Sequence, residues 1–258
     1  MKKIIIFGAI STIYAQFSFS GNTETRLAES SSGYYYNETL INTNLQYGAF
    51  TNWIQLEYSD PPELGRRING VRKMRLEYDN GPVKLKLGDL YEIWGRGLVL
   101  NSVDDQSIDR DTGIRGITLM YNNQTFSTQF IAGKTDISQS TINALGFNNR
   151  THNYHVSHNL YGLNIQKLSG NHDFGFSFLQ GLEKHPVNTF PEDTLNLKNQ
   201  LHSISYSYMD SFFDFYTEYI MNRSYEFDED RWSSHGIGKG LYGNLNLYFN
   251  LFLSLIHI

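Results

Sequence analysis

The sequence predicts an all-β fold, an antiparallel up-and-down transmembrane β-barrel of about twelve strands. Three observations predict it. Apolar and polar residues alternate along many segments, short turns alternate with long polar connections, and aromatic residues flank the short turns. Barrels of the bacterial outer membrane have short periplasmic turns, longer outer loops and aromatic girdles at both membrane surfaces.

Alternation with a period of two marks each expected strand. In the first, residues 17–27, apolar residues, glycine and threonine on one face alternate with serine, asparagine, glutamate and arginine on the other. By the same pattern we expect further strands at residues 41–47, 53–58, 73–78, 83–87, 117–121, 126–132, 161–166, 174–178, 203–208, 213–219 and 241–249. Because only every second residue would face lipid, the mean hydropathy of −0.41 is compatible with a membrane barrel.

Five short turns connect these strands, at residues 48–52, 79–81, 122–124, 169–173 and 209–211. Asp79-Asn80-Gly81 is a strong hairpin signal. Long polar segments such as 182–200 and 222–240 fall between the turns and are expected to be outer loops. A soluble sandwich would place its aromatic residues along strand middles. Here they lie beside the turns, at Tyr47, Phe50, Trp53, Tyr78, Tyr121, Phe126, Phe174, Tyr208, Phe212 and Phe213.

The two ends of the chain do not resemble barrel strands. Residues 1–15 combine Met1-Lys2-Lys3, an apolar run and Ala15, which predicts a secretory signal peptide. Residues 253–258 resemble an in-frame translation of a sequencing adaptor, so we expect a non-native tail and a barrel that occupies residues 16–252. The last strand would then lack its next partner, and we expect an open sheet with a seam between the first and last strands.

Charged residues fall on the face opposite the lipid. This face is expected to line a lumen, where the charges either order water and ions or pair with one another. The lumen-facing charges are Glu57, Lys73, Arg75, Glu77, Lys84, Lys86, Asp214 and Glu218.

Residues 88–101 break the alternation, because apolar residues occupy both faces after Leu90. Such a stretch is usually buried in protein on both sides. We therefore expect the loop around Trp94, Gly95, Arg96 and Gly97 to fold inward, with the glycines permitting the bend. The alternative is a long bulged strand.

Residues 88–101, followed by 104–109 and 114–117, resemble an uncharacterised family of outer-membrane β-barrels from Bacteroidota-like bacteria. The resemblance implies a barrel fold and longer chains. It supplies no known activity, so no functional residue is carried over.

No motif indicates catalysis, a metal or another cofactor. Residues 109–113 have part of a calcium-loop pattern but lack a third acidic ligand and the closing glutamate. His152, His155 and His158 would alternate between the faces of a strand, and Ser157 lacks a nucleophile elbow or an orienting acid. There is no cysteine for a lipid anchor, a disulfide or a thiolate site.

The sequence therefore predicts a bacterial outer-membrane protein that is not an enzyme. We expect a passive channel or uptake pore for small polar solutes. The alternative is a plugged structural or adhesive barrel whose long loops bind partners. Other expected partners are outer-membrane lipid and the barrel-assembly machinery during insertion. The net charge of −5 is spread out and gives no sign of nucleic-acid binding.

Overall fold

The computed structural model describes residues 17–29, 33, 35–62, 67–105, 110–143, 146–186, 194–228 and 231–248. The predicted signal peptide (1–15) and the predicted tail (253–258) lie outside this range. Within the described residues, no helix is long and apolar enough to cross a membrane.

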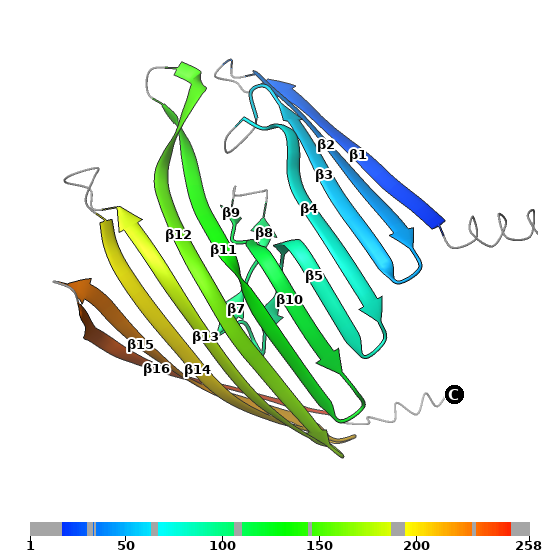
Figure 1. The fold of residues 1–258 in the computed structure, drawn as a ribbon, viewed down its shortest axis with the longest axis vertical. Coiled ribbons are helices and arrows are strands. Elements are labelled where there is room, and N and C mark those ends of the chain that lie inside the picture. The colour runs from blue at the N-terminus through cyan, green and yellow to red at the C-terminus, as the bar shows by residue number, and fades with distance from the viewer. Residues whose placement is uncertain are drawn as a thin grey trace, which may run out of the picture.

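Twelve strands form one antiparallel sheet in chain order, as predicted (Figure 1). They are β1 (Phe17–Glu29), β2 (Tyr35–Tyr47), β3 (Phe50–Ser59), β4 (Asn69–Asn80), β5 (Val83–Leu90), β10 (Ile114–Asn122), β11 (Phe126–Asn143), β12 (Gly146–Ser169), β13 (His172–Pro186), β14 (Thr194–Met209), β15 (Phe213–Asp228) and β16 (Arg231–Leu247). Two small hairpins lie between β5 and β10. Strand β6 (Ile93–Trp94) pairs with β7 (Leu100–Asn101), and β8 (Asp104–Asp105) pairs with β9 (Arg110–Asp111).

The sheet is curved but not closed. Across the described residues, β1 pairs only with β2 and β16 only with β15, so a seam separates the first and last strands. The expected open sheet is therefore confirmed.

The five predicted turns all lie at one end of the sheet, but two of the predicted long loops are largely strand. Strand β13 pairs with β14 as far as Pro186 and Thr194, and β15 pairs with β16 as far as Asp228 and Arg231. The prediction of loops over residues 182–200 and 222–240 is therefore wrong. A polar composition shows where the outer face of a strand is no longer apolar. The strands nevertheless stay paired beyond that point, because backbone hydrogen bonds do not depend on the polarity of the side chains.

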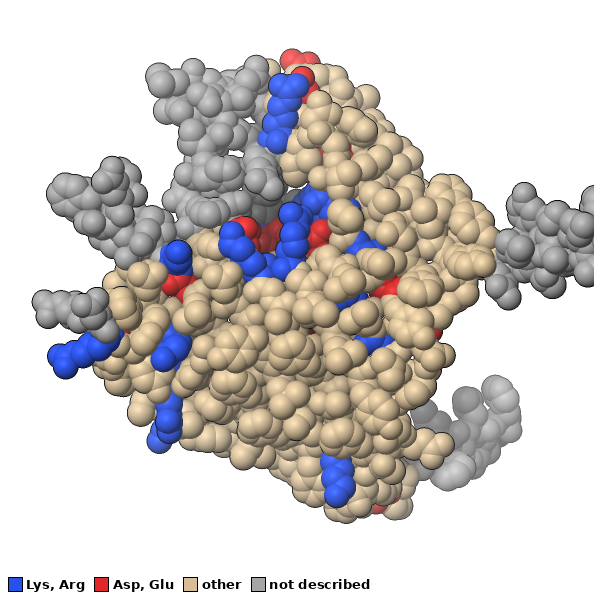
Figure 2. Space-filling model, viewed as in Figure 1, with Lys and Arg blue, Asp and Glu red and all other residues tan. Residues whose placement is uncertain are grey.

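The two faces of the sheet differ as the alternation predicts. Large apolar side chains stand exposed on the outer face, for example Phe19, Met74 and Ile204. Figure 2 shows that the broad lower part of this face carries few charged side chains. Aromatic rings pack in pairs beside the turns, with ring centroids 5.0 Å apart for Phe50 and Tyr78 and 5.2 Å apart for Tyr208 and Phe213.

The inner face is not polar throughout. Five apolar side chains form a strip across neighbouring strands β11 to β15, and it belongs to the main buried cluster of the described residues. Sequence alternation did not predict this strip, because every member except Leu201 sits beside an outward-facing apolar residue. The strip consists of Ile131, Leu160, Leu179, Leu201 and Ile220.

Candidate functional site

The candidate site is built by the chain between β5 and β10, here called the inner segment (residues 91–105 and 110–113). Strands β5 and β10 are short, with 8 and 9 residues, whereas the next strand, β11, has 18. The wall is therefore low where the inner segment leaves it. The hairpins of the segment lie beside β10 and β11 and do not project beyond the long strands (Figure 1).

Trp94 anchors the inner segment on the inner face. Its side chain is 1% exposed and joins the buried cluster that contains the apolar strip. The indole N–H donates a hydrogen bond of 2.9 Å to Oε1 of Gln129 on β11. Gly162 of β12 provides the space, since a Cβ at that position would lie 2.8 Å from the ring atom Cη2.

The residues after Trp94 form a tight bend. Gly95 and Gly97 have φ angles of +58° and +79°, a region that favours glycine. The N–H of Gly97 donates to the carbonyl of Trp94 at 2.9 Å and closes the turn. A Cβ on Gly95 would lie 2.8 Å from Oε2 of Glu218, so glycine is required here by space as well as by φ.

Glu218, on the inner face of the distant strand β15, holds this bend in place. Its side chain is 1% exposed. Oε2 accepts a hydrogen bond of 2.8 Å from the Tyr216 hydroxyl and one of 3.3 Å from the backbone N–H of Arg96. The Arg96 guanidinium lies 4.9 Å from the centre of the Tyr216 ring.

Apolar residues on both faces after Leu90 predict protein on both sides of this stretch, and therefore that Trp94, Arg96 and Leu98 are shielded. Trp94 is buried, but the expectation is wrong for Arg96 and for Leu98, which is 36% exposed. Val99 and Leu100 occupy the buried positions instead. The bend at Gly95 and Gly97 interrupts the extended backbone. The buried side chains therefore do not continue at every second residue after Trp94.

A charged cluster ties the second hairpin of the inner segment to β4. A bulge opposite Gln55 and Leu56 places Arg72 beside Lys73 at this inner site, where simple alternation would send one of them outward. The Arg72 guanidinium lies 2.9 Å from Glu57 and 3.5 Å from Asp104. The Lys73 ammonium pairs with Asp104 and lies 3.0 Å from Oδ2 of Asp111. Figure 2 shows acidic and basic side chains side by side in the hollow above the short strands.

Tyr91 and Asp111 complete this charged cluster. The Tyr91 hydroxyl donates to Oδ1 of Asp111 at 3.0 Å, and the Lys73 ammonium lies 4.8 Å from the centre of the Tyr91 ring. Burial raises the pKa of Tyr91, and the nearby carboxylates add to that effect. Burial also opposes ionisation of Asp111, but the charge of Lys73 and the hydrogen bond from the Gly113 N–H outweigh it and lower the pKa of Asp111.

The other predicted lumen charges pair close to their own strands. Arg75 lies 2.5 Å from Glu77 and 5.2 Å from the Trp53 ring. Lys84 pairs with Asp79 beside a turn at 2.6 Å, and Lys86 pairs with Glu92 of the inner segment at 2.7 Å.

Asp214, near the turn end of β15, accepts a hydrogen bond from the Tyr248 hydroxyl and does not reach the charged cluster. Of the eight predicted lumen charges, the structure thus brings Glu57, Lys73, Lys86 and Glu218 into contact with the inner segment or its anchoring groups. Sequence reasoning missed Arg72, Glu92, Asp104 and Asp111 as their partners. The breakdown of alternation after Leu90 was the available signal, but it did not say which strands the segment would meet.

Within the part of the chain that the structure describes, no group of three or more histidine, cysteine, aspartate or glutamate residues is arranged to hold a metal ion. Asp109 and the side chains of His152 and His155 lie outside the described part. His158 faces Glu183 at 3.9 Å.

Comparison with known proteins places the chain in a family without an assigned activity. No curated protein is similar to it in sequence. Among solved structures, it is similar to the trimer form of OmpT, an in-vitro folded outer membrane protein of Vibrio cholerae. That pair shares 11% identity with a TM-score of 0.40, over 90% of this chain and 83% of that chain. A second OmpT structure from Vibrio cholerae shares 10% identity with a TM-score of 0.43, over 90% of this chain and 81% of that chain.

The model of the DUF6029 family matches residues 5–248, which includes the inner segment, the charged cluster and all twelve strands of the sheet up to β16. The chain therefore belongs to the DUF6029 family, which is described as a family of unknown function.

Proposed function

We propose that this protein is a β-barrel of the bacterial outer membrane that passes small polar solutes along its inner face, with the inner segment as the constriction. The observation that carries the proposal is the position of the inner segment. It lies on a largely polar face, whereas the opposite face is apolar and has aromatic side chains at its turn end. This division suits a wall between lipid and water.

The contacts of the inner segment support a fixed constriction. It is held on β4 by the charged cluster, on β5 by Lys86, on β11 by Gln129 and on β15 by Glu218. Acidic and basic groups line the space around it, and such opposed charges order water and ions in narrow passages. No catalytic group is part of this proposal. Since hydrocarbon leaves no strand edge unpaired, the proposal also requires that β1 and β16 are paired along their outer edges in the membrane.

The same contacts favour one alternative, a barrel that the inner segment plugs, with outer loops that bind partners. Recording the conductance of the full-length protein in planar bilayers separates the two. The matched variant carries Trp94→Ala and Glu218→Ala, which remove the indole donor and the carboxylate acceptor that anchor the segment without changing a turn or an outer-face residue.

Discrete current steps from the native protein, with larger steps from the variant, are expected of a constricted channel. Silence from the native protein and steps from the variant would indicate a plug. Silence from both, after insertion has been verified, would overturn the transport proposal.

A further inference from the structure

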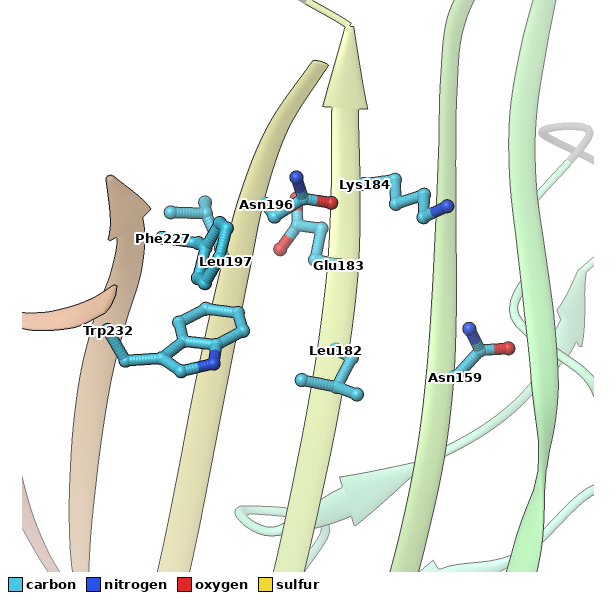
Figure 3. Close-up of a pocket in the computed structure, with 8 residues that line it drawn as sticks. All are labelled: Asn159, Leu182, Glu183, Lys184, Asn196, Leu197, Phe227 and Trp232. Carbon is cyan, nitrogen blue, oxygen red and sulfur yellow. The ribbon is translucent and has the colours of Figure 1, made fainter. Parts of the chain in front are cut away.

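A pocket lies on the outer face of the sheet, on the opposite side from the inner segment. It has a volume of about 280 Å³ and spans β12 to β16 near the ends of the strands that lie away from the turns. Figure 3 shows Phe227 and Trp232 on one side of it and Lys184 and Asn159 on the other, with Leu182 between them. Glu183 and Leu197 also line it, but alternation along β13 and β14 turns their side chains toward the inner face, where Glu183 lies 3.9 Å from His158. The outer-face side chains of the pocket are apolar, amide and cationic.

Strand pairing shows that these side chains share the outer face. Leu182 pairs directly with Lys198, and Lys198 pairs with Tyr225 on the next strand. Cross-strand partners lie on the same face of a sheet, and Leu182 follows Phe174 and Phe176 by an even number of residues along β13. Those two phenylalanines are exposed outer-face residues.

Three cations lie on this part of the face: Lys184 lines the pocket, Lys198 lies beside Trp232 at its edge, and Arg223 follows on β15 two residues nearer the turn than Tyr225. The Lys198 ammonium lies 4.6 Å from the centre of the Tyr225 ring and 4.8 Å from that of Trp232, so two aromatic rings hold it in place. In the described part of the chain, no carboxylate forms an ion pair with any of the three. They present positive charge beside the pocket on the outer face.

The distance of the three cations from the turns matches the thickness of a bilayer. With the turns at one membrane surface, the cations lie at the level of the other. Counted from the turn, Lys184 is the thirteenth residue of β13, Lys198 the twelfth of β14 and Arg223 the eleventh of β15. A tilted strand crosses the hydrocarbon core in about 9–11 residues. Nearer the turn, the same face exposes apolar side chains such as Phe176, Ile204 and Tyr219.

We infer that this pocket binds a phosphorylated glycolipid of the outer leaflet, and this inference rests on the proposed outer-membrane location. The phosphate lies among Lys184, Lys198 and Arg223, where it completes charge-assisted hydrogen bonds. The acyl chains lie along the apolar wall toward the turns, and the headgroup contacts the pocket between Leu182 and Trp232. A free anion would use the cations but not the wall beneath them.

The test uses the full-length protein folded in neutral detergent and native mass spectrometry to measure retained ligand. The probes are diphosphorylated lipid A, dephosphorylated lipid A and inorganic phosphate. The variants are Lys198→Ala and the triple variant Lys184→Ala/Lys198→Ala/Arg223→Ala. The control is Lys167→Ala, which removes an exposed cation from the same face near the turn, where Lys167 pairs with Phe126 and Phe174.

We expect diphosphorylated lipid A to remain bound and the dephosphorylated form and inorganic phosphate to be lost. Affinity should fall about fivefold for Lys198→Ala, which corresponds to about 1 kcal/mol per cation, and more than a hundredfold for the triple variant. Lys167→Ala should bind as the native protein does. Equal binding of the dephosphorylated glycolipid, equal binding of inorganic phosphate, or equal losses in Lys198→Ala and Lys167→Ala would overturn the inference.

Insertion and conductance of the same proteins keep the two proposals distinct. A triple variant that inserts and conducts normally but no longer retains the glycolipid supports both. Normal insertion and conductance with no glycolipid dependence in any variant would refute the site alone. Failure of the native protein to insert into bilayers would refute the outer-membrane location on which the site depends.

Discussion

Replacing Trp94 with alanine should release the inner segment from the sheet while the strands stay paired. Trp94 is 1% exposed, and truncating a buried tryptophan to alanine typically costs about 3–5 kcal/mol. The change also leaves the Gln129 amide oxygen without the donor that it has at 2.9 Å. The cost should fall on the docking of the segment, because no backbone pair of the twelve-stranded sheet includes residue 94.

Hydrogen exchange measured by mass spectrometry reports this local opening directly. Amides of residues 93–101 should exchange faster in Trp94→Ala by about two to four powers of ten, the equivalent of 3–5 kcal/mol. Ile93→Ala is the matched control, because Ile93 is its neighbour in β6 and is 59% exposed. Native-like protection of residues 93–101 in Trp94→Ala, or an equal loss of protection in β13 to β15, would refute the anchoring role of Trp94.

Four further predictions concern the charged cluster, the space beneath Trp94 and the lipid-facing wall. Lys73→Met should destabilise docking of the β8–β9 hairpin by about 2–3 kcal/mol, which is less than for a fully buried ion pair because the Asp111 side chain is 39% exposed. Hydrogen exchange of residues 102–105 measures this change. Unchanged exchange there would argue that the charged cluster does not hold the hairpin. The pKa of Asp111 is lower in the folded protein than in the unfolded chain, so its contribution to docking is complete above the unfolded-state pKa of about 4 and is lost as pH falls through the lower folded-state pKa. The native segment should therefore stay docked at pH 5–8. As acid is added, the difference in exchange between Asp111→Asn and the native protein should shrink. Gly162→Ala should loosen the inner segment by about 1–3 kcal/mol, because the new Cβ would lie 2.7 Å from the Phe178 carbonyl oxygen and 2.8 Å from the Trp94 ring, of which the side chain is freer to move. Native protection of residues 93–101 would contradict this. Finally, Leu45→Arg and Phe176→Arg on the outer face should destabilise the protein folded in lipid vesicles by about 2–4 kcal/mol, whereas Lys84→Ala should have a small effect. Equal effects would show that the two faces are assigned wrongly.

The alternation of side chains was enough to predict the strands, their order and their two faces. Positions such as Phe19 and Ile204 are exposed on the outer face as expected, and Gln55 and Glu57 are buried on the inner one. These features follow from the period of two, which each strand carries in its own sequence. The upper halves of β13 to β16 were missed because polar residues on both faces give no alternating signal, although their backbones remain paired.

The contacts of the inner segment were beyond the reach of sequence patterns. The unusual stretch after Leu90 was visible, and so were its glycines, but its partners Gln129 and Glu218 lie on distant strands. The bulge that brings Arg72 next to Lys73 has no glycine or proline at its own position, and the nearby Gly70 does not say which residue is displaced. Most of the apolar strip on the inner face was visible as doubled apolar residues, such as Phe178 and Leu179, of which alternation assigns only one to the outer face.

The anchors of the inner segment also imply an order in which the molecule assembles. Trp94 and Gln129 are 35 residues apart in the chain, whereas Arg96 and Glu218 are 122 residues apart. Closing a longer loop costs more entropy and takes longer, so we expect the tryptophan to dock while only β5 and β10 to β12 have come together. The hydrogen bond to Glu218 can form only after β15 has joined the sheet. This hydrogen bond therefore forms late in folding, when β15 meets an inner segment that Trp94 has already docked on β11.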